Sequence, residues 1–191
     1  MIGLYICAYA LFISFFLLEL FVRKGKDAKN MERTEFDRSS TTIVSVAMAT
    51  AFILVPISPL LNYLNIGAFH SLWVGIVGVL LGVLGLAVRY LAFATLGRFF
   101  TRTLRETDEH ALVTNGIYHL IRHPGYASDI LIFVGAGLAM GNWLATVVVI
   151  LMFVPAYIYR IQAEEGMLIE IFGEEYIAYQ KKTKRIVPYL F

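Results

Sequence analysis

The residues that could do chemistry lie in the second half of the chain. Arg160 and Glu164 are four residues apart, so a helix would present them on one face at the end of an apolar stretch. A guanidinium in that position suits the carboxylate of a substrate, with Glu164 setting its position. The same spacing also fits an interfacial helix pair worth roughly a few tenths of a kcal/mol. Both interpretations stand at this point.

A histidine and two tyrosines form a second group. His123 precedes Pro124, the pattern of a helix start, where the free N–H groups can be capped or can bind an anion. Tyr118 and Tyr126 flank this pair; aromatic faces suit a sulfonium or ammonium cation, although tyrosine is also enriched at membrane interfaces. His110 has no histidine or cysteine at ligand spacing, so we expect no metal site. Phosphate-binding glycine motifs are absent as well.

The composition is that of a membrane protein. Of the 191 residues 59% are hydrophobic and 16% are charged, against roughly 45–50% and 25% in soluble domains. Cys7 is the single cysteine, which excludes an intrachain disulfide. The net charge is +2, and the basic residues do not alternate with aromatics along one face, so nucleic acid is not an expected partner. We expect one integral-membrane domain over residues 1–191.

Apolar blocks of spanning length predict an all-α, polytopic membrane helix bundle. Pro56 and Pro59 should kink or fray the far end of the second span. Glycines three and four residues apart in the third span should let a neighbouring helix approach closely. About five transmembrane helices are expected, at residues 2–22, 42–61, 72–94, 126–140 and 144–160.

The last two spans are predicted to form a helical hairpin. Residues 127–159 carry a single charge, Asp129, and Gly141 with Asn142 breaks the apolar run. A hairpin should therefore bring the polar groups at its two ends together, His123 on one side and Arg160 with Glu164-Glu165 on the other. One unbroken helix would be roughly 50 Å long, well over the hydrocarbon thickness. The hairpin also places the N-terminus outside and the basic C-terminus, with the active site, in the cytoplasm, as the positive-inside rule requires.

The remaining polar segments should lie at the cytoplasmic interface. Residues 96–121 are too irregular to span, and residues 162–182 are amphipathic with a break at Gly173, which predicts helices that fold back over this loop. Arg89 is expected to reach the interface or to pair with a carboxylate. Asp129 lies where a charge is costly and often functional, and no role is assigned to it.

Together these clusters resemble the isoprenylcysteine carboxyl methyltransferase family of integral-membrane methyltransferases. The resemblance covers about residues 96–188, so residues 1–94 would hold three N-terminal spans and residues 95–191 the cofactor-binding and catalytic half. The segments that carry it are Leu96-Gly97-Arg98-Phe99-Phe100-Thr101, His110-x-Leu112-Val113, Gly116-x-Tyr118, Arg122-His123-Pro124-x-Tyr126, Arg160 with Glu164-Glu165, and Phe172-Gly173-Glu174-Glu175-Tyr176-x-x-Tyr179.

The resemblance implies an S-adenosylmethionine-dependent carboxyl O-methyltransferase. Its lipophilic substrate, a prenylcysteine-like thioether, would enter from the bilayer, and its partners would be this substrate and membrane lipid. Arg160 and Glu164 would be the catalytic residues, and either Thr103 or Arg105 would also face the cofactor. The implied cofactor-binding residues are His110, Ala111, Leu112, Val113, Tyr118, His123, Pro124, Gly125, Tyr126 and Glu165.

The sparse set of polar residues fits this chemistry. A carboxylate is already ionised at neutral pH, so alignment and exclusion of water replace a strong base. Three alternatives remain. A phospholipid-amine N-methyltransferase would need a carboxylate base, because an amine attacks only when neutral. An NADPH-dependent membrane sterol-type reductase has a similar Arg-His-Pro-x-Tyr region. A non-catalytic membrane scaffold would keep the bundle and bind neither cofactor.

Overall fold

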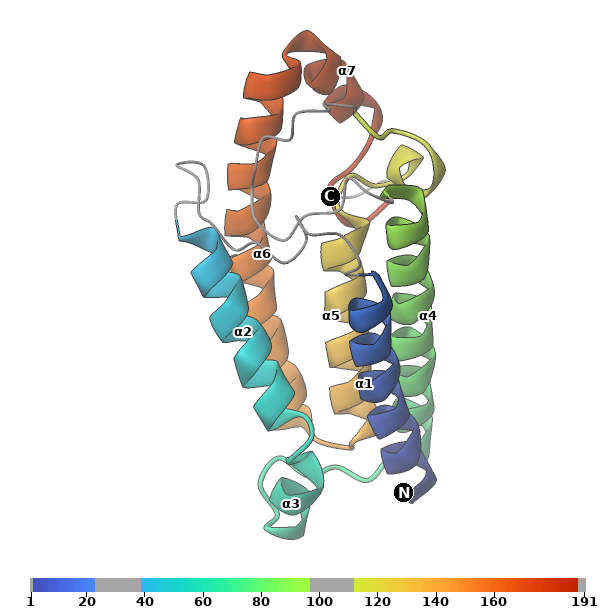
Figure 1. The fold of residues 1–191 in the computed structure, drawn as a ribbon. Helices are drawn as coiled ribbons and strands as arrows, with labels where there is room; N and C mark the ends of the chain where they lie inside the picture. Colours follow the sequence, from blue (N-terminus) through green and yellow to red (C-terminus); the bar gives the residue numbers. More distant parts are fainter. Residues whose placement is uncertain (1, 23–38, 97–111, 189–191) are drawn as a thin grey trace.

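The computed structural model describes residues 2–22, 39–96 and 112–188. In chain order its elements are α1 (Ile2–Val22), α2 (Ser40–Leu54), α3 (Ser58–Tyr63), α4 (Leu72–Leu96), the 3₁₀ turn η4 (Gly116–His119), α5 (Pro124–Ala139), α6 (Trp143–Phe172) and α7 (Glu174–Lys182). The helices α1, α2, α4, α5 and α6 run alternately up and down (Figure 1). The described ranges contain two isolated bridges and no β-strand, which confirms the all-α prediction.

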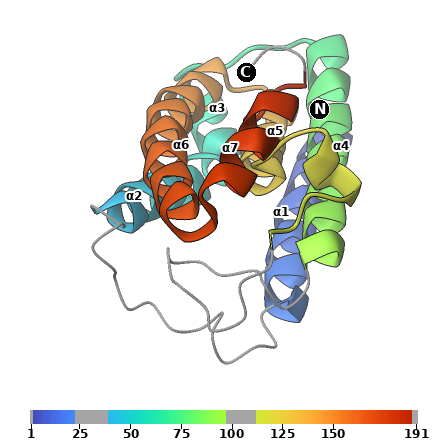
Figure 2. The same cartoon turned by 90° about the horizontal axis from the view of Figure 1, so that it is seen from above.

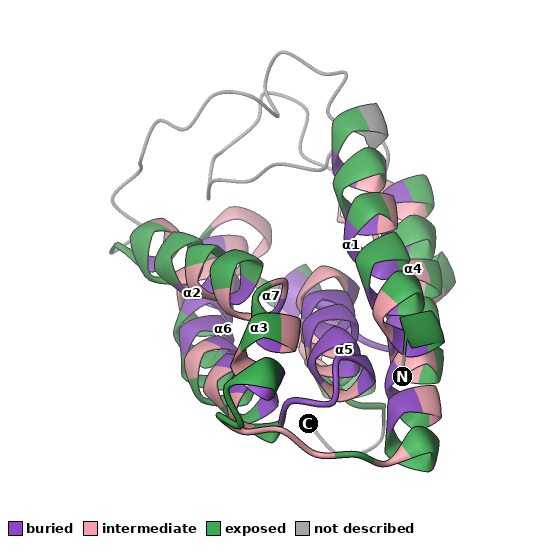
Figure 3. Ribbon diagram, turned by 90° about the horizontal axis from the view of Figure 1, so that it is seen from below, coloured by how far each residue is buried: buried purple, intermediate pink, exposed green. Residues whose placement is uncertain are grey.

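Three helices are long and apolar enough to cross a membrane: α1 over Ile2–Leu20, α4 and α6. The helices α2 and α5, with 15 and 16 residues, are apolar but shorter than the roughly 20 residues of a typical span. In Figure 3 α5 is coloured as buried or intermediate along its whole length, whereas α1 and α4 turn exposed faces outward. The predicted membrane bundle is therefore confirmed, with two of its five expected spans short.

The second expected span ends early at its prolines. The helix α2 stops at Leu54, a turn contains Pro56, and the short helix α3 begins with Pro59 in its first turn. Proline lacks the N–H that would continue the hydrogen-bond ladder, so the predicted fraying becomes a complete break. The helix α3 then lies at the end of the bundle opposite α7 (Figure 1).

The predicted hairpin is present between α5 and α6. Gly141 adopts a φ of 66° in the turn, and Asn142 caps α6 by accepting a hydrogen bond from the N–H of Ala145 at 2.8 Å. The Asn142 amide also donates to the Oδ1 of Asn62 at 2.8 Å, which ties the turn to α3. One unbroken helix over this region is thereby excluded.

The helix α6 extends further than the sequence indicated. Instead of ending near Arg160, it continues without a break to Phe172, and Pro155 lies inside it. Gly173, with a φ of 55°, ends α6, and α7 then folds back. Figure 2, seen from above, shows α7 crossing this end of the bundle between α6 and α4. The predicted break at Gly173 is confirmed.

The core surrounds α5. Phe133 of α5 packs edge-on against Phe12 of α1, Phe52 of α2 and Phe153 of α6, with ring centroids 5.2–5.3 Å apart. On the other side of α5, the backbone of α4 approaches closely. A Cβ added to Gly78 would lie only 2.5 Å from the carbonyl oxygen of Gly135, so glycine is needed there. The glycine face of α4 therefore serves the close helix packing that was predicted.

Candidate active site

The polar residues that could do chemistry meet where α5 begins and the far half of α6 passes it. His123 occupies the N-cap position of α5, but its side chain makes no capping hydrogen bond. The residue is 5% exposed, and its imidazole faces α6 instead. Its Nε2 lies 3.4 Å from the Oε1 of Glu165 and its Nδ1 lies 3.7 Å from the Oε2 of Glu164. The hairpin therefore brings the histidine and both glutamates together, as the sequence predicted.

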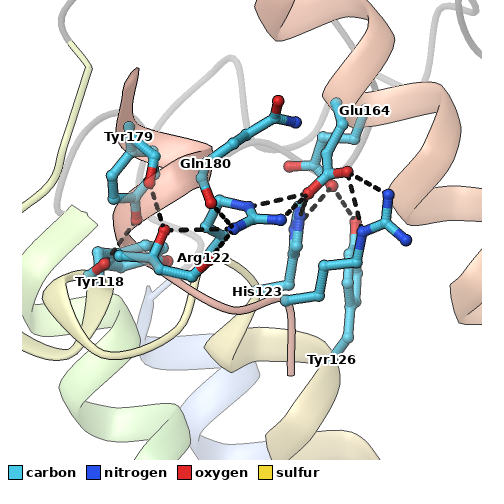
Figure 4. A network of polar contacts seen from close by, with 10 residues as sticks. Tyr118, Arg122, His123, Tyr126, Glu164, Tyr179 and Gln180 are labelled. Carbon is cyan, nitrogen blue, oxygen red and sulfur yellow. Dashed lines mark hydrogen bonds and ion pairs between the residues drawn. The ribbon is translucent and has the colours of Figure 1, made fainter. Parts of the chain in front are cut away.

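Tyr126, in the first turn of α5, joins the two predicted catalytic residues, and Figure 4 shows its hydroxyl beside Glu164. Its hydroxyl donates to the Oε2 of Glu164 at 2.7 Å and accepts from the Nε of Arg160 at 3.3 Å. Its ring stacks on that of His123, with centroids 5.7 Å apart and planes 15° from parallel. One hydroxyl thus sets the positions of a cation and an anion from the next helix.

Arg160 also contacts a third helix. Its Nη1 donates to the Oγ of Ser40 at 2.8 Å and to the Oγ1 of Thr41 at 2.9 Å, at the start of α2. The residue is 4% exposed. The hydroxyls of Ser40, Thr41 and Tyr126 are therefore among the groups that orient the guanidinium at the end of the apolar core.

Glu165, expected in the cofactor shell, lies in an ion cluster. Its Oε1 accepts from the Nε of Arg122 at 2.9 Å, and its Oε2 accepts from the Nη2 of Arg185 at 2.7 Å. With His123 at 3.4 Å, three basic side chains surround a carboxylate that is 4% exposed. The sequence placed Arg122 in a motif and Arg185 in a basic tail, but no local pattern indicated that they meet at Glu165.

The C-terminal segment covers this cluster. The backbone N–H groups of Arg122 and His123 donate to the carbonyls of Lys184 and Arg185 at 2.8 and 2.9 Å. The hydroxyl of Tyr179 donates to the carbonyl of Tyr118 at 2.6 Å (Figure 4). Burial raises the pKa of Tyr179 to about 12, so this phenol stays a donor at neutral pH. The predicted folding back over the interfacial loop is confirmed for α7 and the described end of this loop. Residues 162–172 continue α6 instead, and residues 97–111 of the loop lie outside the described ranges.

The other predicted cofactor residues lie around the contacts of His123, Tyr126 and Glu164 or outside the described residues. Leu112 and Val113 lie half-buried in non-helical chain before η4. Pro124 is buried in the first turn of α5, and a Cβ on Gly125 would meet no atom within 4 Å. Burial, and after it the carboxylate of Glu164, raises the pKa of Tyr118 above its usual range. The remaining candidates lie outside the described residues: His110, Ala111, Thr103 and Arg105.

One buried hydroxyl near the site was not predicted. The phenolic oxygen of Tyr176 in α7 has no hydrogen-bond partner, alone among the buried side-chain N and O atoms of the described ranges. Burial, followed by the carboxylates of Glu165 and Glu164, raises the pKa of Tyr176 above its usual range. A buried, unpaired hydroxyl costs about 1–3 kcal/mol, which a ligand at this place would relieve.

A second cluster lies deeper in the bundle. Arg89 of α4 forms ion pairs with Glu19 of α1 and Asp129 of α5, and all three are at most 6% exposed. The expectation that Arg89 pairs with a carboxylate is confirmed, and Asp129 gains two partners, Arg89 and the hydroxyl of Tyr157. Within the described ranges, no three side chains of the metal-binding types are grouped for an ion.

Comparison with known proteins identifies the family. The phospholipid methyltransferase family model matches residues 73–175, more than half of the chain. The probable protein-S-isoprenylcysteine O-methyltransferase of Oryza sativa subsp. indica is 32% identical over 160 residues, which are 80% of this chain and 84% of the rice protein. The chain belongs to the isoprenylcysteine carboxyl methyltransferase family.

Further members of this family agree. Protein-S-isoprenylcysteine O-methyltransferase A of Arabidopsis thaliana is 31% identical over 159 residues, 80% of this chain and 81% of the plant protein. The solved structure of the eukaryotic intramembrane Ras methyltransferase ICMT has the same fold, with a TM-score of 0.64 and 24% identity over 97% of this chain. The chain spans 65% of the length of that structure. The family assignment therefore agrees with the fold described above.

Proposed function

We propose that this protein transfers a methyl group from S-adenosylmethionine to the carboxylate of a lipophilic thioether, a prenylated cysteine. The observation that carries the proposal is the hydroxyl of Tyr126, which joins Arg160 to Glu164 at the end of an apolar helix bundle. The named relatives are isoprenylcysteine O-methyltransferases, and their activity supports this choice of substrate.

Arg160 is the group we assign to the substrate carboxylate. A substrate carboxylate brings a full negative charge and two acceptor oxygens that match the guanidinium fork. The hydroxyls of Ser40 and Thr41 that hold the guanidinium are neutral acceptors, so the carboxylate competes well with them. A carboxylate needs no deprotonation at neutral pH, so the protein has to orient it and to exclude water. Glu164, held by Tyr126, would fix the guanidinium or accept from a substrate amide.

The residues present fit S-adenosylmethionine, which carries a sulfonium, an ammonium and a carboxylate. The ring of Tyr126 and the carboxylate of Glu164 suit the cationic groups, and the uncapped start of α5 suits the carboxylate. A Cβ on Gly125 would meet no atom within 4 Å, so there is open space beside this residue. The hydroxyl of Tyr176, which has no hydrogen-bond partner and whose pKa is raised by burial, lies close enough to Glu165 and Glu164 for their charges to raise its pKa further. When bound, the cofactor supplies an electrophilic methyl group on sulfur.

The membrane completes the proposal. The helices α1 and α4 expose large apolar side chains over much of their length, so lipid surrounds the bundle and the substrate tail would arrive from lipid. The site lies at the end of the bundle that carries α7 (Figure 1). The basic residues that follow α7 support a cytoplasmic location for this end, by the positive-inside rule. The N-terminus would then lie outside.

A second candidate, methylation of a phospholipid amine, is favoured by the description of the matching family model. Glu164, whose side chain is 27% exposed, would then act as the base that removes a proton from the amine. The relatives named above are named as O-methyltransferases, and they give no support to the NADPH-dependent reductase or to the non-catalytic scaffold.

The test uses the purified full chain in detergent. Calorimetry should show binding of S-adenosylhomocysteine and no binding of NADPH. Radiolabelled methyl transfer should then be measured to N-acetyl-S-farnesylcysteine and, separately, to vesicles of phosphatidylethanolamine. Label that is released as methanol by mild alkali is a methyl ester and supports the proposal. Alkali-stable label on the phospholipid would replace it by the amine reaction, and binding of NADPH alone would overturn both.

A further inference from the structure

The buried cluster of Glu19, Arg89 and Asp129 has no part in the proposed reaction, although ionisable groups inside a membrane bundle are costly and usually functional. The Nε of Arg89 donates to the Oε1 of Glu19 at 3.0 Å, and its Nη1 pairs with the Oδ1 of Asp129. The same Nη1 donates to the Oγ of Ser128 at 3.2 Å. These contacts tie α1, α4 and α5 together and use one oxygen of Asp129.

The other oxygen of Asp129 points to a different partner. Its Oδ2 accepts from the hydroxyl of Tyr157 at 2.8 Å, and Tyr157 is 1% exposed. The ring of Tyr157 stacks on the ring of Tyr126, with centroids 4.8 Å apart and planes 21° from parallel. Tyr126 in turn bridges Arg160 and Glu164. An unbroken series of contacts thus runs from the ion cluster to the candidate catalytic residues.

The helical spacing explains why these groups meet. Tyr126 and Asp129 are three residues apart on α5, and Tyr157 and Arg160 are three apart on α6, so each pair lies on one helix face. Phe153 also packs edge-on with Tyr157, with ring centroids 5.4 Å apart. With its ring in contact with Phe153 and its hydroxyl held by Asp129, Tyr157 gives Tyr126 a fixed surface to stack on.

We propose that Asp129 is a positioning residue for the methyl transfer. Through the hydroxyl of Tyr157 it fixes the plane on which Tyr126 stacks, and so holds the Tyr126 hydroxyl between Arg160 and Glu164. Arg89 and Glu19 hold Asp129 in place. The effect on turnover rests on the proposed function, whereas the series of contacts does not.

A positioning role of Asp129 can be distinguished from a role in folding, because its two oxygens have different partners. A purely structural ion pair requires the oxygen that faces Arg89, and Tyr157→Phe leaves that pair intact while it removes the bond to the other oxygen. The matched control is Tyr9→Phe, which also loses one hydroxyl hydrogen bond, to the carbonyl of Pro56 at 2.7 Å. Tyr9 lies on α1, outside the series of contacts.

Turnover of N-acetyl-S-farnesylcysteine and affinity for S-adenosylhomocysteine are measured for the two variants. Tyr157→Phe should lower kcat about tenfold, below the roughly 10²-fold loss that a 1 Å misplacement can cause, with KM and cofactor affinity changed less than about twofold. Tyr9→Phe should keep the wild-type kcat. An unchanged kcat in Tyr157→Phe, or an equal loss in both variants, overturns the positioning role.

A second measurement does not depend on activity. The midpoint of thermal unfolding in detergent is compared for Asp129→Asn, Tyr126→Phe and the double variant, in the wild-type and in the Tyr157→Phe background. The two shifts should be non-additive in the wild type and additive without the Tyr157 hydroxyl. Additive shifts in both backgrounds overturn the inference whether or not the protein turns over. Non-additive shifts in an inactive wild type would support the contacts and overturn the proposed function.

Discussion

The hydroxyl of Tyr126 lies 2.7 Å from the Oε2 of Glu164 and links the start of α5 to the far half of α6. The same oxygen accepts from Arg160 at 3.3 Å. A phenol can donate once and accept as well, so this residue satisfies both neighbours at once. The arrangement makes Tyr126 the first residue to test, before either charged partner.

Tyr126→Phe should leave the fold and the stacking on His123 intact but remove the shared hydrogen bonds. Because Arg160 and Glu164 then lose a common anchor, we expect kcat to fall about 10- to 100-fold. Affinity for S-adenosylhomocysteine, measured by calorimetry, should change little because the aromatic face remains. Tyr63→Phe is the control, since Tyr63 is 82% exposed at the opposite end. Wild-type turnover in Tyr126→Phe would contradict the arrangement.

Arg160→Ala should preserve cofactor affinity and abolish turnover, because the guanidinium is assigned to the substrate carboxylate. Arg160→Lys keeps the charge but loses the planar fork that serves Ser40, Thr41 and Tyr126 together. We therefore expect Arg160→Lys to recover only a small part of the activity, mainly through a raised KM. Loss of cofactor affinity and of turnover in equal measure would place Arg160 in the cofactor shell or in folding instead.

The elements of this fold were largely predictable because their signals are local. A run of apolar residues, the prolines of the second span and the break at Gly141 each act on the nearest turns, and the structure confirms all three. The end of α6 was not predicted correctly. The sequence placed it near Arg160, but the helix continues for twelve more residues to Phe172. The sequence changes there from uniformly apolar to amphipathic, and a helix accepts both patterns without interruption.

The long-range pairs could not be predicted. Glu19 and Arg89 are 70 residues apart, and Arg122 meets Glu165 across 43 residues. Hydrophobic periodicity indicates which face of a helix is buried, but it does not indicate which charged residue on another helix will lie opposite. The sequence thus predicted that His123, Glu164 and Arg160 converge, whereas the hydroxyl of Tyr126 that joins two of them needed the structure.

Glu165→Gln should destabilise the C-terminal segment. Glu165 binds Arg122, Arg185 and His123 at once, and removal of one partner from a buried ion pair typically costs about 3–5 kcal/mol. Arg185 is 31% exposed, so we expect about 3 kcal/mol, the lower end of that range. Glu170→Gln, at an exposed position of the same helix, is the matched control.

Thermal unfolding in detergent and limited proteolysis after α7 measure this effect. Glu165→Gln should lower the unfolding midpoint and expose the tail to protease, and Glu170→Gln should do neither. If Glu165 served only the cofactor, Glu165→Gln would weaken binding of S-adenosylhomocysteine without lowering the midpoint of the free protein, and the ion cluster would have no structural role.

Gly78→Ala should destabilise the bundle at the contact between α4 and α5. The added Cβ would lie 2.5 Å from the carbonyl oxygen of Gly135 and 2.6 Å from the backbone nitrogen of Ala139. Backbone atoms cannot move aside as a flexible side chain can, so the helices must separate at a cost of about 1–3 kcal/mol. Gly166→Ala is the matched control, because its Cβ would meet no atom within 4 Å in α6. There the substitution should stabilise the protein by up to about 1 kcal/mol. Equal shifts of the unfolding midpoint in the two variants would mean that α4 and α5 do not pack through their backbones.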